Sequence, residues 1–97
     1  MKRILIENHI PVGRENAITR TQLCVASGLS DRKAREEIEQ ARRSGVIIVN
    51  AQDGAGYFRT DDLEEIKRQY DQNEHRARSI LVQQKFLRRR LKDAGVI

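Results

Sequence analysis

The chain has 97 residues, enough for one small domain, and 19 Lys and Arg against 14 Asp and Glu give it a net charge of +5. This basic balance favours polyanionic partners but equally fits a solvated helical protein. Cys24 is the only cysteine, which excludes an intrachain disulfide and a cysteine metal cluster. The first apolar run stops at Glu7, too early for a secretion signal, and no stretch approaches the roughly 20 apolar residues of a membrane span. We therefore expect a cytoplasmic protein without a membrane association.

The N-terminal segment predicts little regular structure. Residues 2–9 are rich in apolar side chains, and we expect them to form a short helix that ends before Pro11 and Gly13. Residues 9–16 are typical of a loop, and Ala17 with Ile18 fits a very short strand.

A first short helix is predicted between Thr19 and Gly28. Thr19 and Gln22 have the spacing of a capping box, in which each side chain bonds to the other residue's backbone N–H. Leu23 and Ala26 repeat at helical spacing, and Gly28 is a stop signal. Cys24 is expected on the buried side of this helix.

A second helix is predicted over residues 31–44. Ser30 is a favourable N-cap and Gly45 a natural C-terminal cap. Ala34, Ile38 and Ala41 follow one another at spacings of four and three, which places them on one face. We expect this face to be buried and the opposite face to be exposed.

A hairpin and a long helix complete the chain. Residues 46–49 are β-branched throughout and predict a strand; Asp53, Gly54 and Gly56 mark a turn, and Tyr57 with Phe58 begins the return strand. From residue 60 to Gly95 there is neither Pro nor Gly, which predicts a helix over about 61–93, capped by Thr60 or Asp61. The weak helix formers at residues 71–74 favour a break in this helix.

The order helix, three-residue turn, helix, hairpin resembles a winged helix-turn-helix domain, and the resemblance covers residues 17–60. In that family a small residue in the first helix, a glycine in the turn and an apolar residue after it are common, here Cys24, Gly28 and Leu29. Ser30 opens the second helix, Ala34 and Ile38 are its inward positions, and residues 43–47 resemble the exit into the wing. Cys24 replaces the usual Ala, Ala34 is smaller than the usual Val, and the second helix is nearly neutral.

The expected fold class is therefore mostly α with a small β-hairpin: a winged helix-turn-helix domain over residues 1–60, followed by a long C-terminal, coiled-coil-like helix over 61–97. The chain is similar in layout to small winged-helix proteins of bacterial prophages and mobile elements. The resemblance implies a dimeric DNA-binding regulator, or a mobile-element protein, that recognises double-stranded DNA.

The second helix is expected to read bases, because the major groove, about 12 Å wide, admits one helix. Arg and Lys can bond guanine, and Glu can accept from cytosine. The same charges also suit a solvated helix face. The expected DNA-binding residues, from both helices and the wing, are Arg20, Thr21, Ser30, Arg32, Lys33, Arg35, Glu36, Gln52 and Arg59.

The long helix carries a seven-residue repeat that predicts a homodimer. A helix of about 33 residues is roughly 50 Å long, more than one small domain covers. The alternative is that its first half packs on its own domain. The direction of pairing is left open by the sequence. The expected dimerisation residues are Ile66, Tyr70, Asn73, Ala77, Ile80, Gln84, Leu87 and Leu91.

No catalytic set is evident, and the protein is expected not to be an enzyme. His9 and His75 lack metal-ligand spacing with other ligands, and residues 54–56 are too short for a phosphate loop. We expect no metal, no cofactor and no small-molecule effector. Two other hypotheses stay open: a protein-interaction module that assembles through the C-terminal helix, and RNA binding through the basic tail, which lacks paired exposed aromatics for base stacking.

Overall fold

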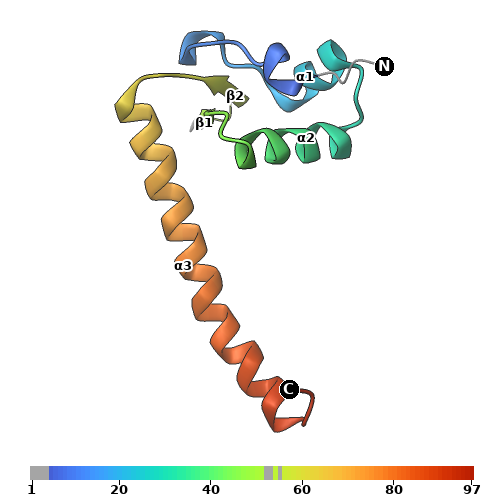
Figure 1. The fold of residues 1–97 in the computed structure, drawn as a ribbon, viewed down its shortest axis with the longest axis vertical. Coiled ribbons are helices and arrows are strands. Elements are labelled where there is room, and N and C mark those ends of the chain that lie inside the picture. The colour runs from blue at the N-terminus through green and yellow to red at the C-terminus, as the bar shows by residue number, and fades with distance from the viewer. Residues whose placement is uncertain (1–4, 52–53, 55) are drawn as a thin grey trace. The chain divides into compact units, whose positions relative to one another are not determined.

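The computed structural model describes residues 5–51, 54 and 56–97. It has the expected fold class, mostly helical with a two-stranded antiparallel hairpin and a long C-terminal helix (Figure 1). The chain divides into an N-terminal unit, residues 1–66, and a C-terminal unit, residues 67–97. The elements are the 3-10 turns η1 (Ile6–His9) and η2 (Arg14–Asn16), the helices α1 (Arg20–Ser27), α2 (Asp31–Arg43) and α3 (Leu63–Asp93), and the strands β1 (Ile48–Ala51) and β2 (Gly56–Arg59).

Helix α1 begins and ends as the sequence predicts. The Gln22 N–H donates to the Thr19 hydroxyl at 3.1 Å and the Thr19 N–H donates to the Gln22 side chain at 3.0 Å, a complete capping box. Gly28 closes the helix with a φ of 74°, which an L side chain rarely adopts. The buried face was only partly predicted, because Leu23 and Ser27 are buried while Ala26 is exposed.

Helix α1 departs from the prediction at Ser27, which is buried, and at Cys24, which is not, because the helix faces the core along Leu23 and Ser27. The Ser27 hydroxyl donates to the Leu23 carbonyl at 2.7 Å and accepts the Leu29 N–H at 3.3 Å, so a polar side chain is buried with its hydrogen bonds made. Cys24, expected in the core, is half-buried instead, because Leu23 and Ser27 define the inward direction one residue away from it.

Helix α2 buries the predicted face, as Ala34, Ile38 and Ala41 are all buried. The Ser30 hydroxyl accepts the Lys33 N–H at 3.1 Å and caps the first turn, as expected. The helix ends in a Schellman motif, in which the N–H groups of the two residues after the cap return to carbonyls of the last turn. The Val46 N–H donates to the Ala41 carbonyl at 3.0 Å in this motif.

The hairpin begins two residues later than predicted, at Ile48 instead of residue 46. Val46 belongs to the Schellman motif of α2 and Ile47 is exposed, so the β-branched run is divided between a helix cap and a strand. The strands pair antiparallel with Val49 opposite Phe58 and Ala51 opposite Gly56. Of the predicted turn residues, Asp53 lies outside the described residues.

Both faces of the hairpin are covered. The main core joins Ile48 to apolar residues of both helices and of the segment before α1; its buried members are Ile6, Ile10, Leu23, Ile38, Ala41 and Ile48. A second cluster contains Val49, Ala51 and Phe58, with Ala17 packed against it. The hairpin therefore binds the N-terminal segment to the helices.

The segment before α1 contains no long helix or regular strand in its described part. The predicted helix over 2–9 is a single 3-10 turn at Ile6–His9, and residues 1–4 lie outside the described residues. The predicted strand at Ala17–Ile18 is one antiparallel bridge, Ile18 to Tyr57, and Val12 makes a parallel bridge with Arg59. Long-range pairing, which local pattern does not encode, orders this segment.

Helix α3 begins at Leu63, two residues after the predicted start. The Asp62 carboxylate accepts the Glu64 N–H at 2.9 Å, so Asp62 fills the capping role expected of its neighbours. The helix does not break at 71–74, and i,i+4 ion pairs flank this weak stretch, Lys67–Asp71 before it and Glu74–Arg78 after it. No helix in the described part of the chain is long and apolar enough to cross a membrane.

Candidate nucleic-acid interface

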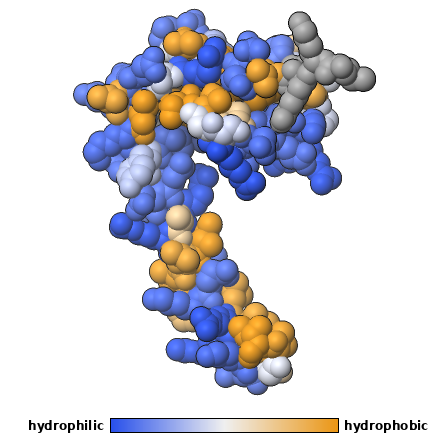
Figure 2. Space-filling view, viewed as in Figure 1, coloured by the Kyte–Doolittle hydropathy of each residue, from blue (hydrophilic) through white to orange (hydrophobic). Residues whose placement is uncertain are grey.

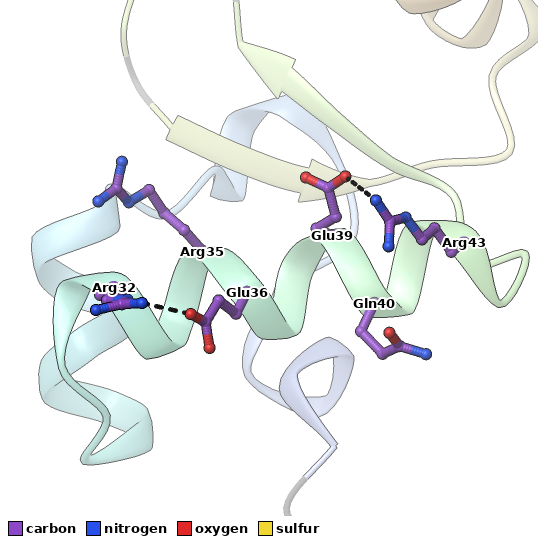
Figure 3. Close-up of a pocket in the computed structure, with 6 residues that line it drawn as sticks. All are labelled: Arg32, Arg35, Glu36, Glu39, Gln40 and Arg43. Carbon is purple, nitrogen blue, oxygen red and sulfur yellow. Dashed lines mark hydrogen bonds and ion pairs between the residues drawn. The ribbon is translucent and has the colours of Figure 1, made fainter.

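The exposed side of α2 is a shallow polar surface. Burial of Ala34, Ile38 and Ala41 fixes the rotation of the helix and leaves the opposite side to solvent. Its side chains extend from the helix over three turns (Figure 3). We call this surface the outer face of α2; it is lined by Arg32, Arg35, Glu36, Glu39, Gln40 and Arg43.

The outer face contains three of the predicted DNA-binding residues, Arg32, Arg35 and Glu36. Lys33 is exposed at its side, where its ammonium pairs with the Glu37 carboxylate at 3.2 Å. The Ser30 hydroxyl accepts the Lys33 N–H and so caps α2. Gln52, predicted on the wing, lies outside the described residues.

Three members of the outer face were not predicted, namely Glu39, Gln40 and Arg43. Counting from Arg32, they follow at seven, eight and eleven residues, the spacing of a continuous helical stripe. The same periodicity that identified the buried side thus also specified them. The stripe carries cations at both ends and carboxylates with one amide between them.

Every cation on or beside the outer face has a carboxylate partner one turn away. Arg32 pairs with Glu36 at 3.2 Å and Arg43 with Glu39 at 3.0 Å (Figure 3), and Arg35 pairs with Asp31 at 3.4 Å. Exposed i,i+4 pairs contribute only about 0.3–0.5 kcal/mol each. A bidentate contact to a base discriminates by about 1–3 kcal/mol, so such pairs would open readily against a matching surface.

Arg20 connects the first turns of the two helices. As the first residue of α1 it forms an ion pair with Asp31, the first residue of α2, and Asp31 also pairs with Arg35. The negative charge of Asp31 raises the pKa of Arg20 above its ordinary value, so this guanidinium stays charged at every working pH. Thr21 is exposed beside it.

Arg59, predicted as a wing contact, is half-buried and is used within the fold. Its Nε donates to the Ile10 carbonyl at 2.8 Å and its backbone N–H donates to the Pro11 carbonyl at 2.8 Å. Arg42 has a similar function at the other strand, where its guanidinium donates to the Ile48 carbonyl at 3.1 Å. These two arginines hold the hairpin to its neighbours.

The described residues contain no group of three or more His, Cys, Asp and Glu that could hold a metal ion. His9 lies in η1 and His75 in α3, in different units of the chain. Among the described residues of the N-terminal unit, the outer face of α2 gathers alternating charges on one exposed surface.

Comparison with known proteins adds no relative from which a function can be transferred. No family model, no curated protein and no solved structure matches this chain. The functional argument therefore depends on the chain's own residues.

Proposed function

We propose that this protein is a winged helix-turn-helix protein that binds double-stranded DNA sequence-specifically as a homodimer in the cytoplasm. The single observation that carries the proposal is the outer face of α2, a fully polar stripe opposite a buried apolar face. In the chain, α2 follows α1, a capped helix that ends in a turn with the left-handed Gly28, and it precedes the β1–β2 hairpin. A dimeric regulator or a mobile-element protein fits this design.

The dimensions and chemistry of α2 suit a DNA groove. Its 13 residues make a rod about 20 Å long, and the major groove of DNA is about 12 Å wide. Arg32 and Arg43 can bond guanine, Gln40 can bond adenine, and the carboxylates between them can accept from cytosine. A stripe of mixed sign favours reading of particular bases over general attraction to phosphate.

The surroundings of α2 supply the positioning contacts. Arg20 is a charged donor at the N-terminal end of α1, an arrangement that suits a phosphate. The β1–β2 loop would lie against the flanking backbone, with Gln52 as the predicted contact. Arg59 supports the hairpin from within and is not counted among the contacts.

Charge reversal on α2 tests DNA recognition. A target is first selected from random duplexes, and binding of the parent and of the R32E/K33E variant is then compared at moderate salt. We expect the variant to lose about tenfold to a hundredfold or more in affinity, because two cations that attract DNA become carboxylates that repel it, and the Arg32–Glu36 and Lys33–Glu37 ion pairs are replaced by like charges. Fluorescence anisotropy of a labelled duplex measures the loss.

The matched control is K67E/R68E, which changes the net charge equally but lies on α3. It should retain sequence preference. Equal binding by the parent and by R32E/K33E would remove the basis of the proposal.

Helix α3 supports the homodimer. It is 31 residues and so about 46 Å long, and none of its residues is buried. Orange patches along α3 in Figure 2 mark its exposed apolar side chains. The predicted seam supplies exposed Tyr70, Ile80, Leu87 and Leu91, and a second copy of the helix is the simplest cover for a heptad repeat.

Ile80→Asp tests the seam, and Val82→Asp is its matched control. The two residues are 50% and 53% exposed, but two positions along a helix place them on different sides, and only Ile80 lies in the seam. We expect Ile80→Asp to give monomers in sedimentation and Val82→Asp to keep the parent mass. An unchanged mass for Ile80→Asp would reject this seam.

A second candidate is a protein-interaction module without DNA binding. It is favoured by Leu81, Val82 and Phe86, which are exposed and lie outside the predicted seam. If selection from random duplexes enriches no sequence, while the protein still forms oligomers through α3, the result would fit this alternative.

A further inference from the structure

The positive charge of this chain is concentrated in the C-terminal half of α3. Between residues 76 and 92 the sequence contains seven bases and no acid. The preceding stretch, residues 61–74, contains six acids and two bases. The excess of basic residues in the whole protein therefore comes from one segment, outside the proposed recognition helix.

These bases differ from those of α2 in their pairing. Arg78 pairs with Glu74 at 3.2 Å, but in the described part of the chain the other six have no ion pair. The cations on the outer face of α2 all have carboxylate partners. Uncompensated charge, which releases counterions from a polyanion, is thus available on α3 and largely neutralised on α2.

Four of the unpaired bases form a stripe on one side of the helix. Lys85, Arg88, Arg89 and Lys92 follow at spacings of three, one and three, and they line one shallow surface together with Asp93. The stripe spans about 10 Å along the axis, the rise of roughly three nucleotides in one DNA strand. None of the four is a seam residue, so the stripe stays accessible when the seam is covered.

We propose that this basic stripe, Lys85, Arg88, Arg89 and Lys92, contacts DNA phosphates independently of sequence. The inference rests on the proposed function, which makes DNA the ligand. In this arrangement α2 selects bases, and α3 adds affinity for DNA of any sequence. Guanidinium groups match phosphate oxygens with paired donors, and lysine adds a point charge. Both act on any sequence, because phosphates are the same at every step.

The apolar residues nearby favour DNA over a lipid surface. A helix that lies in a membrane interface needs one wide apolar face opposite its basic face. Here Val82 and Phe86 lie across the helix from Ile80, Leu87 and Leu91, so apolar side chains are distributed on both sides.

Salt dependence tests the stripe. Binding of the full chain to a random-sequence duplex is measured between about 50 and 200 mM salt for the parent, R88Q/R89Q and the control K67Q/R68Q. Each phosphate contact contributes about 0.9 to the slope of log affinity against log salt, so R88Q/R89Q should lower its magnitude by roughly 2. The control loses equal charge, but Lys67 pairs with Asp71 and Arg68 also interacts within the chain, so its slope should hardly change.

The outcomes separate this inference from the proposed function. A slope that R88Q/R89Q leaves unchanged overturns the stripe, even if the parent binds a selected site through α2. A lowered slope supports the stripe, even if R32E/K33E binds every duplex as the parent does and the proposed function fails. Phosphatidylserine vesicles form a second arm: if R88Q/R89Q weakens vesicle binding but not duplex binding, the stripe recognises lipid and the inference is wrong. Sedimentation of each variant checks that the oligomeric state is the same.

Discussion

Gly56→Ala is expected to separate the hairpin from the segment before α1. Gly56 has a φ of 106°, and a Cβ there would overlap the backbone carbonyl of Ile18 and lie 2.7 Å from the Thr19 Cα. The adjacent bridge, in which Ile18 and Tyr57 exchange N–H···O bonds of 2.8 and 2.9 Å, would have to open. Loss of these bonds, added to backbone strain, should lower the free energy of unfolding by about 3 kcal/mol or more.

Gly54→Ala is the matched control. Gly54 also has a positive φ, 81°, but a Cβ there meets nothing within 4 Å. The control should therefore cost only about 1–2 kcal/mol. Amide exchange followed by NMR reports on the N-terminal unit separately from α3; equal protection of the Ile18 and Tyr57 amides in both variants would contradict the clash.

Phe58→Ala is expected to destabilise the N-terminal unit by about 3–5 kcal/mol. Phe58 is 0% exposed and is the largest member of the second cluster, opposite Val49 in the hairpin. The guanidinium carbon of Arg14 lies 5.4 Å from its ring centroid, so the substitution also removes a cation–π contact. Domains are typically stable by only about 5–15 kcal/mol, so much of the unit's stability depends on this ring.

Phe58→Leu separates volume from the aromatic contact. It keeps most of the buried volume, so we expect it to recover most of the loss. Urea unfolding followed by the NMR signals of Val49 and Tyr57 gives the comparison. If Phe58→Ala unfolds at the parent's urea concentration, the second cluster does not stabilise the unit.

Helix ends and the buried face of α2 were predictable because their signals are local. Thr19 with Gln22, Gly28 and Ser30 specify their caps within three or four residues of chain. The strand start was harder, because Val46 has high strand propensity but is recruited by the Schellman motif that Gly45 allows. At Val46 the hydrogen bonding at the end of α2 therefore outweighs the β-propensity of the side chain.

The N-terminal segment was not predictable, because its order comes from partners distant in sequence. Ile6 and Ile10 are fully buried only through contact with the helices and the hairpin. The Arg59 guanidinium reaches back 49 residues to the Ile10 carbonyl. No periodicity within residues 5–18 encodes such a contact, and the position of Arg59 after the turn does not reveal that its guanidinium bonds to the Ile10 carbonyl.

The candidate interface was predicted in part. The predicted set contained Arg32, Arg35 and Glu36, which lie in the first two turns of α2. It did not contain the later members of the outer face, Glu39, Gln40 and Arg43. The charge compensation along α2 was visible as i,i+4 spacing. The contrast with the unpaired bases of α3 required coordinates, because pairing depends on which rotamers reach a partner.

The Arg14 side chain has a consequence for dissecting this protein into fragments. Besides covering Phe58, its guanidinium donates to both carboxylate oxygens of Glu65, at 3.1 and 2.7 Å. The first turn of α3 therefore belongs with the residues before it, in the compact unit that ends at Ile66. A recombinant fragment intended to isolate the N-terminal unit has to extend through Ile66; trimming at residue 60 would delete Glu65 and with it the two hydrogen bonds that Arg14 donates to its carboxylate.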